Sequence, residues 1–237
     1  MRMAKHTFRD GLKDAIPIAL GYLSVSFGFG LMAASMGLSA GIAVLISAVN
    51  VTSAGQVAGI SIIAAGGGFA EMALTQLVIN IRYALMSLSI SQKLDRPRFG
   101  LGRRLAAAFC MTDEVFAVAS GREAPIGPEY FAGLEVLSFA GWVLGTLLGC
   151  VAGDLMPQTV AATLSIAMYG MFIAIVTPVA RENRGVALCA LIAIGMSCLL
   201  RYVPLFSGVT SGFSVILCAV AASAVAAWLK PVREVEE

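Results

Sequence analysis

A long apolar stretch with a charged residue at its centre constrains this chain more than any other feature. Residues 72–90 are mostly apolar and carry Asn80, Arg82 and Tyr83 near their middle. About 20 such residues cross the roughly 30 Å hydrocarbon core of a bilayer. An arginine at that depth costs about 2.5–3.5 kcal/mol on insertion, so it normally faces protein or a watery path. The sequence therefore predicts a membrane protein that handles a polar group inside the bilayer.

Composition agrees with a lipid bilayer as the surroundings. Hydrophobic residues make up 59% of the 237 residues and charged residues 13%, with a mean hydropathy of +0.88. A soluble domain carries about 25% charged residues. The net charge of +2 is too small to indicate a nucleic-acid partner. The single histidine, His6, and the lack of a C-x-x-C pair argue against zinc sites and Ser-His hydrolases. We expect no metal, no cofactor and no enzymatic activity.

The remaining apolar segments predict the architecture. They lie at about 15–36, 41–65, 69–91, 131–153, 159–178, 186–203 and 210–229, with a shorter one near 103–120. We interpret all of them as helices, because a lipid-exposed segment must satisfy its own backbone hydrogen bonds. The predicted fold is all-α, a polytopic membrane helix bundle of about 6–8 transmembrane or re-entrant helices. One transporter domain covers 15–229, between a cytoplasmic arm, 1–14, and a short charged tail, 230–237.

Clusters of basic residues predict the topology. The arm contains Arg2, Lys5, Arg9 and Lys13, and the longest polar loop contains Lys93, Arg96, Arg98, Arg103 and Arg104. The positive-inside rule places both in the cytoplasm, which requires an even number of crossings between them. Three apolar segments lie between the arm and the loop, so one of the three is expected not to cross the membrane completely. We favour segment 41–65, which small polar residues interrupt; the alternative is three full crossings with an external loop.

Those interrupting residues are also candidate ligands. Thr52, Ser53, Gly55 and Gln56 permit a break in the helix. Backbone N–H groups freed at a half-helix N-terminus bind anionic groups such as a carboxylate. The alternative is hydrogen bonding between helices. We predict that these four residues contribute to a substrate site.

The helix around Arg82 carries two polar stripes. The first contains Gln76, Asn80, Tyr83 and Ser87, and the second contains Thr75, Arg82 and Ser89. Between them lie Leu77, Ile81, Ala84 and Leu88, the expected lipid-facing surface. We expect protein to surround this helix on most sides, and Asn80, Arg82 and Tyr83 to line or brace a substrate path. The alternative is a structural arginine paired with an acidic residue.

A pair of acidic residues lies in the short segment 103–120. Thr112, Asp113 and Glu114 occupy its middle, close to apolar neighbours. A carboxylate in such surroundings must be paired or protonated. We predict that Asp113 or Glu114 acts as a gate or proton-coupling group, with Arg82 as one possible partner. The segment itself is open to three interpretations: a re-entrant hairpin, an interfacial helix, in which case both acids are in water, or a crossing.

One further segment carries a packing signal. Gly141, Gly145, Gly149 and Gly153 recur every four residues and predict close helix packing. The neighbour is either another helix of this chain or a partner protein. Residues 22–36 also align with 135–149, which indicates a possible internal repeat of the kind found in transporters.

Four motifs together resemble one protein family. They are Pro17 with the Gly-rich helix that follows it, Thr52-Ser-Ala-Gly-Gln56, Asn80-Ile-Arg-Tyr83 and Thr112-Asp-Glu-Val-Phe116. The chain resembles the AzlC family, the large subunits of bacterial branched-chain amino acid exporters. The resemblance implies a multi-pass protein of the bacterial inner membrane, an amino-acid substrate and a small AzlD-type membrane subunit as partner. The alternatives are a permease for a different small solute and a non-transporting membrane scaffold.

Overall fold

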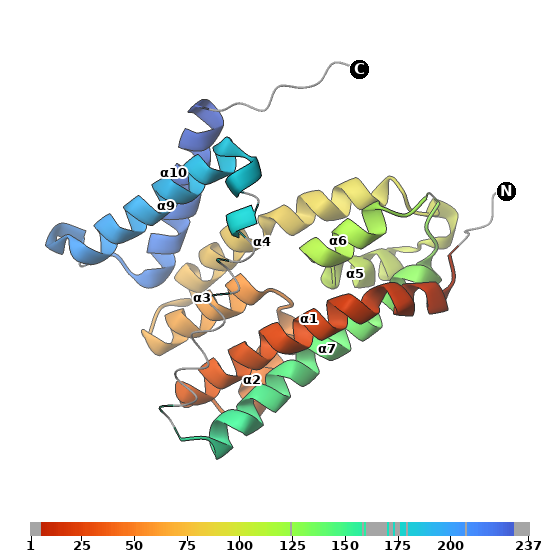
Figure 1. The fold of residues 1–237 in the computed structure, drawn as a ribbon, viewed down its shortest axis with the longest axis horizontal. Coiled ribbons are helices and arrows are strands. Elements are labelled where there is room, and N and C mark those ends of the chain that lie inside the picture. The colour runs from red at the N-terminus through yellow and green to blue at the C-terminus, as the bar shows by residue number, and fades with distance from the viewer. Residues whose placement is uncertain are drawn as a thin grey trace. The chain divides into compact units, whose positions relative to one another are not determined.

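The structure is a computed structural model that describes residues 6–123, 125–157, 180–206 and 208–229, with 159, 170, 173 and 176–178 as isolated positions. Every regular element in those residues is a helix, which confirms the all-α prediction (Figure 1). Five of the described helices are long and apolar enough to cross a membrane. They are α1 (Phe8–Ser35), α4 (Phe69–Ser91), α7 (Pro128–Leu155), α9 (Arg184–Tyr202) and α10 (Ser211–Leu229).

Shorter helices connect these spans. They are α2 (Ala40–Val49), α3 (Ser53–Ala64), α5 (Leu101–Phe109) and α6 (Asp113–Ser120), with single 3₁₀ turns at Arg96–Arg98 and Pro204–Phe206. Most of the predicted segment 159–178 lies outside the described residues, as does the tail 230–237. The proposed internal repeat therefore stays a prediction, because part of its second half falls there.

The chain divides into two compact units. Unit 1 comprises Met1–Gln56 and Asn80–Met168, and unit 2 comprises Val57–Ile79 and Tyr169–Glu237. The α4 helix contributes its first half to unit 2 and its second half to unit 1. The single transporter domain predicted over 15–229 stays a prediction.

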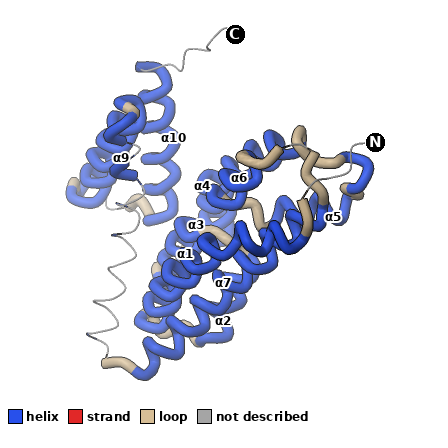
Figure 2. The backbone as a smooth tube through the Cα atoms, turned by 45° about the vertical axis from the view of Figure 1, so that its right-hand side comes forward, coloured by secondary structure: helices blue, strands red, loops and turns tan. Residues whose placement is uncertain are grey.

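Two long parallel helices, α1 and α7, form the centre of unit 1 (Figures 1 and 2). A capping box starts α1: Thr7 Oγ1 accepts from the Asp10 N–H at 3.3 Å, and the Thr7 N–H donates to Asp10 Oδ2 at 2.9 Å. Pro128 occupies the first turn of α7, where its missing N–H has no cost. The two helices run in the same direction, because Gly11 contacts α7 beside Tyr130 and Gly30 contacts it beside Cys150.

Glycine permits the close approach of these helices. A Cβ on Gly141 would lie 2.5 Å from the Ala19 carbonyl oxygen, and one on Gly153 would lie 2.8 Å from Ala34 Cβ. Gly145 and Gly149 likewise contact the α1 backbone. The predicted glycine face therefore packs against a helix of the same chain, and α1 leaves it unavailable to a partner protein.

The loop 93–104 and the start of α1 lie at the same end of unit 1. Arg122, just after α6, donates to both Asp14 carboxylate oxygens, with an Nε–Oδ2 distance of 2.9 Å. Lys93 donates to the Ser120 carbonyl oxygen, next to Arg122. Two backbone hydrogen bonds of 2.9 Å then join residues 93–95 to Ile126, two residues before α7. This agrees with the prediction that the arm and the basic loop face one side of the membrane.

Within unit 2, α9 and α10 pack against each other, and Glu71 of α4 caps α10. The Glu71 side chain is buried, and its Oε1 accepts from the Gly212 N–H at 2.9 Å and from the Thr210 hydroxyl. A carboxylate here also complements the positive end of the α10 dipole. Glu71 was not predicted as a cap, because the residues it caps lie about 140 positions away.

Replacing Glu71 with alanine is expected to destabilise unit 2. The substitution leaves the Gly212 N–H buried and without its acceptor, which costs about 1–3 kcal/mol. Thermal unfolding of the purified protein in detergent measures the effect. The matched control is Glu129→Ala, because Glu129 is half exposed and its ion pair with Arg98 contributes little. Equal melting temperatures for the two variants would contradict a capping role.

Candidate functional site

Two helix breaks bring polar residues into the apolar part of unit 1. The first break, Asn50–Thr52, separates α2 from α3, in agreement with the interruption predicted within segment 41–65. The second, Cys110–Thr112, separates α5 from α6. Each break ends in a threonine that caps the next helix: Thr52 Oγ1 accepts from the Gly55 N–H and Thr112 Oγ1 from the Val115 N–H, both at 3.4 Å. Threonine suits this position because its hydroxyl satisfies an N–H group that lacks a helical partner.

The α5–α6 pair folds back on itself as a helical hairpin. Ring contacts place α5 along α7, because Phe99 lies 6.0 Å from Phe131 and Phe109 lies 6.3 Å from Phe139. Eight helical residues separate those two α7 positions, or about 12 Å. The chain then turns at Thr112 and returns through α6 to Arg122, which is anchored at the starting end. This geometry is that of a helical hairpin and does not correspond to a single crossing, and its depth in the membrane stays a prediction.

An ion pair connects the hairpin to α4. Arg82 Nη1 donates to Asp113 Oδ1 at 2.8 Å and lies 2.7 Å from Oδ2, while Nη2 donates to the Tyr83 hydroxyl at 3.0 Å. The Tyr83 hydroxyl in turn donates to Thr52 Oγ1 at 3.4 Å. The two breaks are thus joined through α4 by Arg82 and Tyr83. The Arg82 and Asp113 side chains remain 48% and 42% exposed, so this pair is accessible from outside the unit.

Tyr22 of α1 completes the second break. Its buried hydroxyl donates to Glu114 Oε2 at 2.6 Å and shares a hydrogen bond with the Thr112 hydroxyl. Glu114 is therefore held by α1, whereas Asp113 is held by α4. Tyr22 was missed as a site residue, because a single tyrosine in a Gly-rich apolar helix carries no periodic polar signal.

Gln56 takes part in a separate polar chain. Its Nε2 donates to Ser47 Oγ at 2.6 Å, and Ser47 Oγ lies 2.6 Å from Thr146 Oγ1 on α7. All three side chains are buried, and Gln56 Oε1 has no hydrogen-bond partner in the described part of the chain. The geometry corresponds to the alternative raised for Gln56, hydrogen bonding between helices. Ser47 and Thr146 were not predicted, since each is one polar residue in an apolar helix.

The remaining predicted ligands lie on α3 and α4. Ser53 and Gly55 occupy the first turn of α3, directly after Thr52, and Asn80 is half-buried one turn before Tyr83. The predicted lipid-facing positions are exposed, including Leu77 at 58%. Within the described residues, 11% of the most apolar window of α4 is buried, and the expectation that protein surrounds this helix stays a prediction.

The arrangement is suited to holding a small charged molecule. Two half-helices begin at Thr52 and Thr112, and helix N-termini favour negative charge. The Arg82 guanidinium adds a planar fork that matches a carboxylate. Asp113 and Glu114 supply the opposite charge at the same place. A positive and a negative group side by side are complementary to a zwitterion.

Comparison with known proteins gives one family. The sequence model of the family described as AzlC protein matches residues 17–156. The chain is 29% identical to the inner membrane protein YgaZ of Escherichia coli over 195 residues, covering 79% of this chain and 78% of that one. It is 32% identical to an uncharacterized membrane protein of Archaeoglobus fulgidus over 177 residues, covering 72% and 75%. No solved structure gives a significant match. The matched residues include both helix breaks and Arg82.

Proposed function

Since this chain belongs to the AzlC family of membrane proteins, we propose that it exports branched-chain or similar apolar amino acids across the bacterial inner membrane. The role is transport, not catalysis. The family membership and the candidate membrane spans support a multi-pass protein of that membrane. The substrate class is the part of the proposal that rests on the site.

The observation that carries this proposal is the junction of the two helix breaks at Arg82, Asp113, Thr52 and Thr112. Transporters form their substrate sites from discontinuous helices near the middle of the bilayer. Backbone that is not helical at membrane depth is tolerated only where protein buries it or where it lines a cavity. A non-transporting scaffold has no need for such breaks or for an ion pair among apolar helices.

In the proposed mechanism, Arg82 receives the substrate carboxylate. Arginine has five N–H donors, and the bonds to Asp113 and Tyr83 leave some of them for a ligand. Asp113 exchanges its bond to Arg82 for the substrate ammonium group or for a proton, and Glu114 stays bonded to Tyr22 as the fixed side of the gate. Asn80, Tyr83 and the start of α3 brace the site, and the apolar surroundings select an apolar side chain.

The proposal is tested by leucine, isoleucine, valine and methionine efflux from cells that express this chain with and without a small AzlD-type subunit. We expect efflux above background only when both are present. Efflux of a different solute, with none of these four amino acids, would favour a permease of other specificity. No efflux of any small solute would favour the scaffold.

The exposed surface of α4 supports a membrane partner. The Arg82–Asp113 pair is about half exposed, and an ion pair facing hydrocarbon is unfavourable. An apolar side chain, Leu85 at 66% exposure, lies one turn further along the same helix. We propose that the AzlD-type subunit covers this surface and keeps lipid away from the pair.

A large side chain on α4 is therefore expected to weaken assembly. Leu85→Trp should reduce co-purification of the small subunit severalfold, because the added ring separates the helices. Leu20→Trp is the matched control, since Leu20 is 63% exposed on α1, away from the proposed contact. The measurement is the ratio of the two subunits after affinity purification of the large one. An unchanged ratio for Leu85→Trp would remove this part of α4 from the interface.

A further inference from the structure

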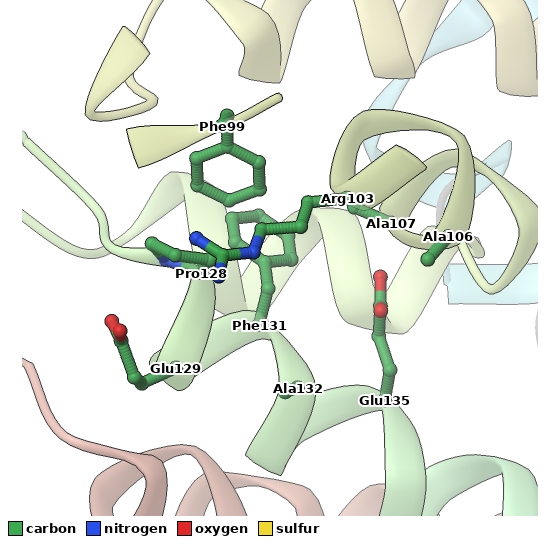
Figure 3. A pocket seen from close by; sticks show the side chains of 9 residues that line it. All are labelled: Phe99, Arg103, Ala106, Ala107, Pro128, Glu129, Phe131, Ala132 and Glu135. Carbon is green, nitrogen blue, oxygen red and sulfur yellow. The ribbon is translucent and has the colours of Figure 1, made fainter. Parts of the chain in front are cut away.

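A second candidate binding site lies between α5 and α7 of unit 1, apart from the helix breaks. A cavity of about 250 Å³ opens there, at the end of the unit that carries the loop 93–104. Phe99, Phe131 and Ala107 form apolar walls, and three charged side chains, Arg103, Glu129 and Glu135, also line it (Figure 3). Its volume is near the lower end of small-molecule pockets, which measure about 300–1,000 Å³ for drug-sized ligands.

Glu135 is the unexplained residue of this cavity. Its side chain is 8% exposed and extends from α7 toward Ala106 and Ala107 of α5 (Figure 3). Its Oε1 has no hydrogen-bond partner among the residues that the structure describes. A buried carboxylate without a partner is costly, and buried charges are normally paired. A cation entering the cavity would supply the missing partner.

Arg103 provides a charge of opposite sign on the other wall. Its Nη1 donates to the Arg98 carbonyl oxygen at 2.9 Å, which holds the guanidinium in place. The side chain extends across the cavity toward Pro128 (Figure 3). Within the described residues no ion pair joins Arg103 to Glu135. Besides Glu129, which pairs with Arg98, the cavity therefore presents two charged side chains that are not paired with each other, among apolar lining residues.

We propose that this cavity binds an apolar amino acid as a zwitterion. The ammonium group binds Glu135, the carboxylate binds Arg103, and the aliphatic side chain lies against Phe99 and Phe131. The choice of an amino acid among ammonium compounds rests on the proposed export function. The position also fits that function, since the positive-inside rule places this end in the cytoplasm, where an exporter takes up its substrate. The site would load substrate before it reaches the helix breaks.

The test measures ligand binding to the purified full-length chain in lipid nanodiscs by calorimetry. Three ligands separate the two charges: leucine, isoamylamine, which lacks the carboxylate, and isocaproate, which lacks the ammonium group. Glu135→Gln should weaken leucine and isoamylamine binding roughly tenfold or more, because a charged hydrogen bond is lost. Arg103→Gln should weaken leucine but leave isoamylamine unchanged. Isocaproate should bind the wild type less tightly than leucine.

Glu129→Gln is the matched control. Glu129 lies on the same helix and at the same cavity, but it is half exposed and pairs with Arg98 at 2.5 Å, so leucine affinity should hold. Glu135→Gln removes no hydrogen bond from Oε1, so it should melt at or above the wild-type temperature. Ala106→Leu keeps Glu135 and Arg103 but fills part of the cavity, so it should also lower leucine affinity. If Glu135→Gln fails to fold, Ala106→Leu tests whether leucine binds in this cavity.

Equal leucine affinity in the wild type, Glu135→Gln and Ala106→Leu would overturn the site, as would the absence of leucine and isoamylamine binding to the wild type. The proposed export function fails in a different way. Binding that depends on Glu135 without any efflux refutes export and keeps the site, whereas efflux that is unaffected in Glu135→Gln keeps export and refutes the site.

Discussion

Replacing Arg82 with alanine or lysine is expected to lower amino-acid efflux at least roughly tenfold in a protein that still folds. Lysine keeps the charge but loses the planar fork that bonds Asp113 and Tyr83 together. Breaking a fully buried ion pair costs about 3–5 kcal/mol. This pair is about half exposed, so the cost to folding is smaller and the single variants should remain measurable.

A double variant separates a transport role from a structural one. Arg82→Leu with Asp113→Leu removes both charges and leaves no unpaired group. If Arg82 and Asp113 only neutralise each other, the double variant regains both abundance and efflux. If the two residues form part of the substrate path, the double variant regains abundance but not efflux. We expect the second result. Arg98→Ala is the matched control, since its pair with Glu129 has similar exposure but lies at the loop end. Full efflux from the double variant would remove both residues from the site.

The largest effect on folding is expected from Gly149→Leu. A Cβ at this position would approach the Phe27 carbonyl group and lie 3.0 Å from Gly30 Cα, all backbone atoms of α1. No side-chain rotation relieves such a contact, so α1 and α7 must separate. Overpacking a core typically lowers the free energy of unfolding by about 1–3 kcal/mol. A clash between two backbones should cost at least the upper value of this range. We expect little folded protein.

The yield of monodisperse protein after detergent extraction measures this effect, with thermal unfolding of what remains. Gly21→Leu is the control, because Gly21 lies on α1, the other helix of the pair, and a Cβ added there would meet no heavy atom within 4 Å. The same added volume therefore enters open space. Equal yields for the two variants would mean that α1 and α7 do not depend on close backbone contact.

A local signal in the sequence was sufficient to locate the first helix break, since Thr52 lies next to small polar residues in an apolar segment. The second break, before Asp113, was not located, because 103–120 was open to three interpretations. The contacts that organise the site were not visible. Tyr22 reaches Thr112 across 90 positions, and Ser47 reaches Thr146 across 99. A single hydroxyl in an apolar helix does not reveal which distant helix it faces.

The surroundings of a helix are harder to predict from sequence. The exposed face of α4 was predicted from its apolar residues, whereas polar stripes do not specify which element covers them, so the expectation of surrounding protein stays a prediction. Glu135 shows the same difficulty. As one acidic residue near the start of an apolar helix it resembles an interfacial charge, and only the approach of α5 reveals that it is buried.

The parallel arrangement of α1 and α7 has a consequence for biosynthesis. The ribosome makes α1 first, yet about 90 residues must follow Ser35 before α7 begins at Pro128. At roughly 5–20 residues per second, that interval lasts about 5–20 s. During it, the newly inserted first helix lacks the contacts that Gly11 and Gly30 make with α7. Its own apolar residues and the helices made in the interval must keep it in the membrane until α7 leaves the translocon.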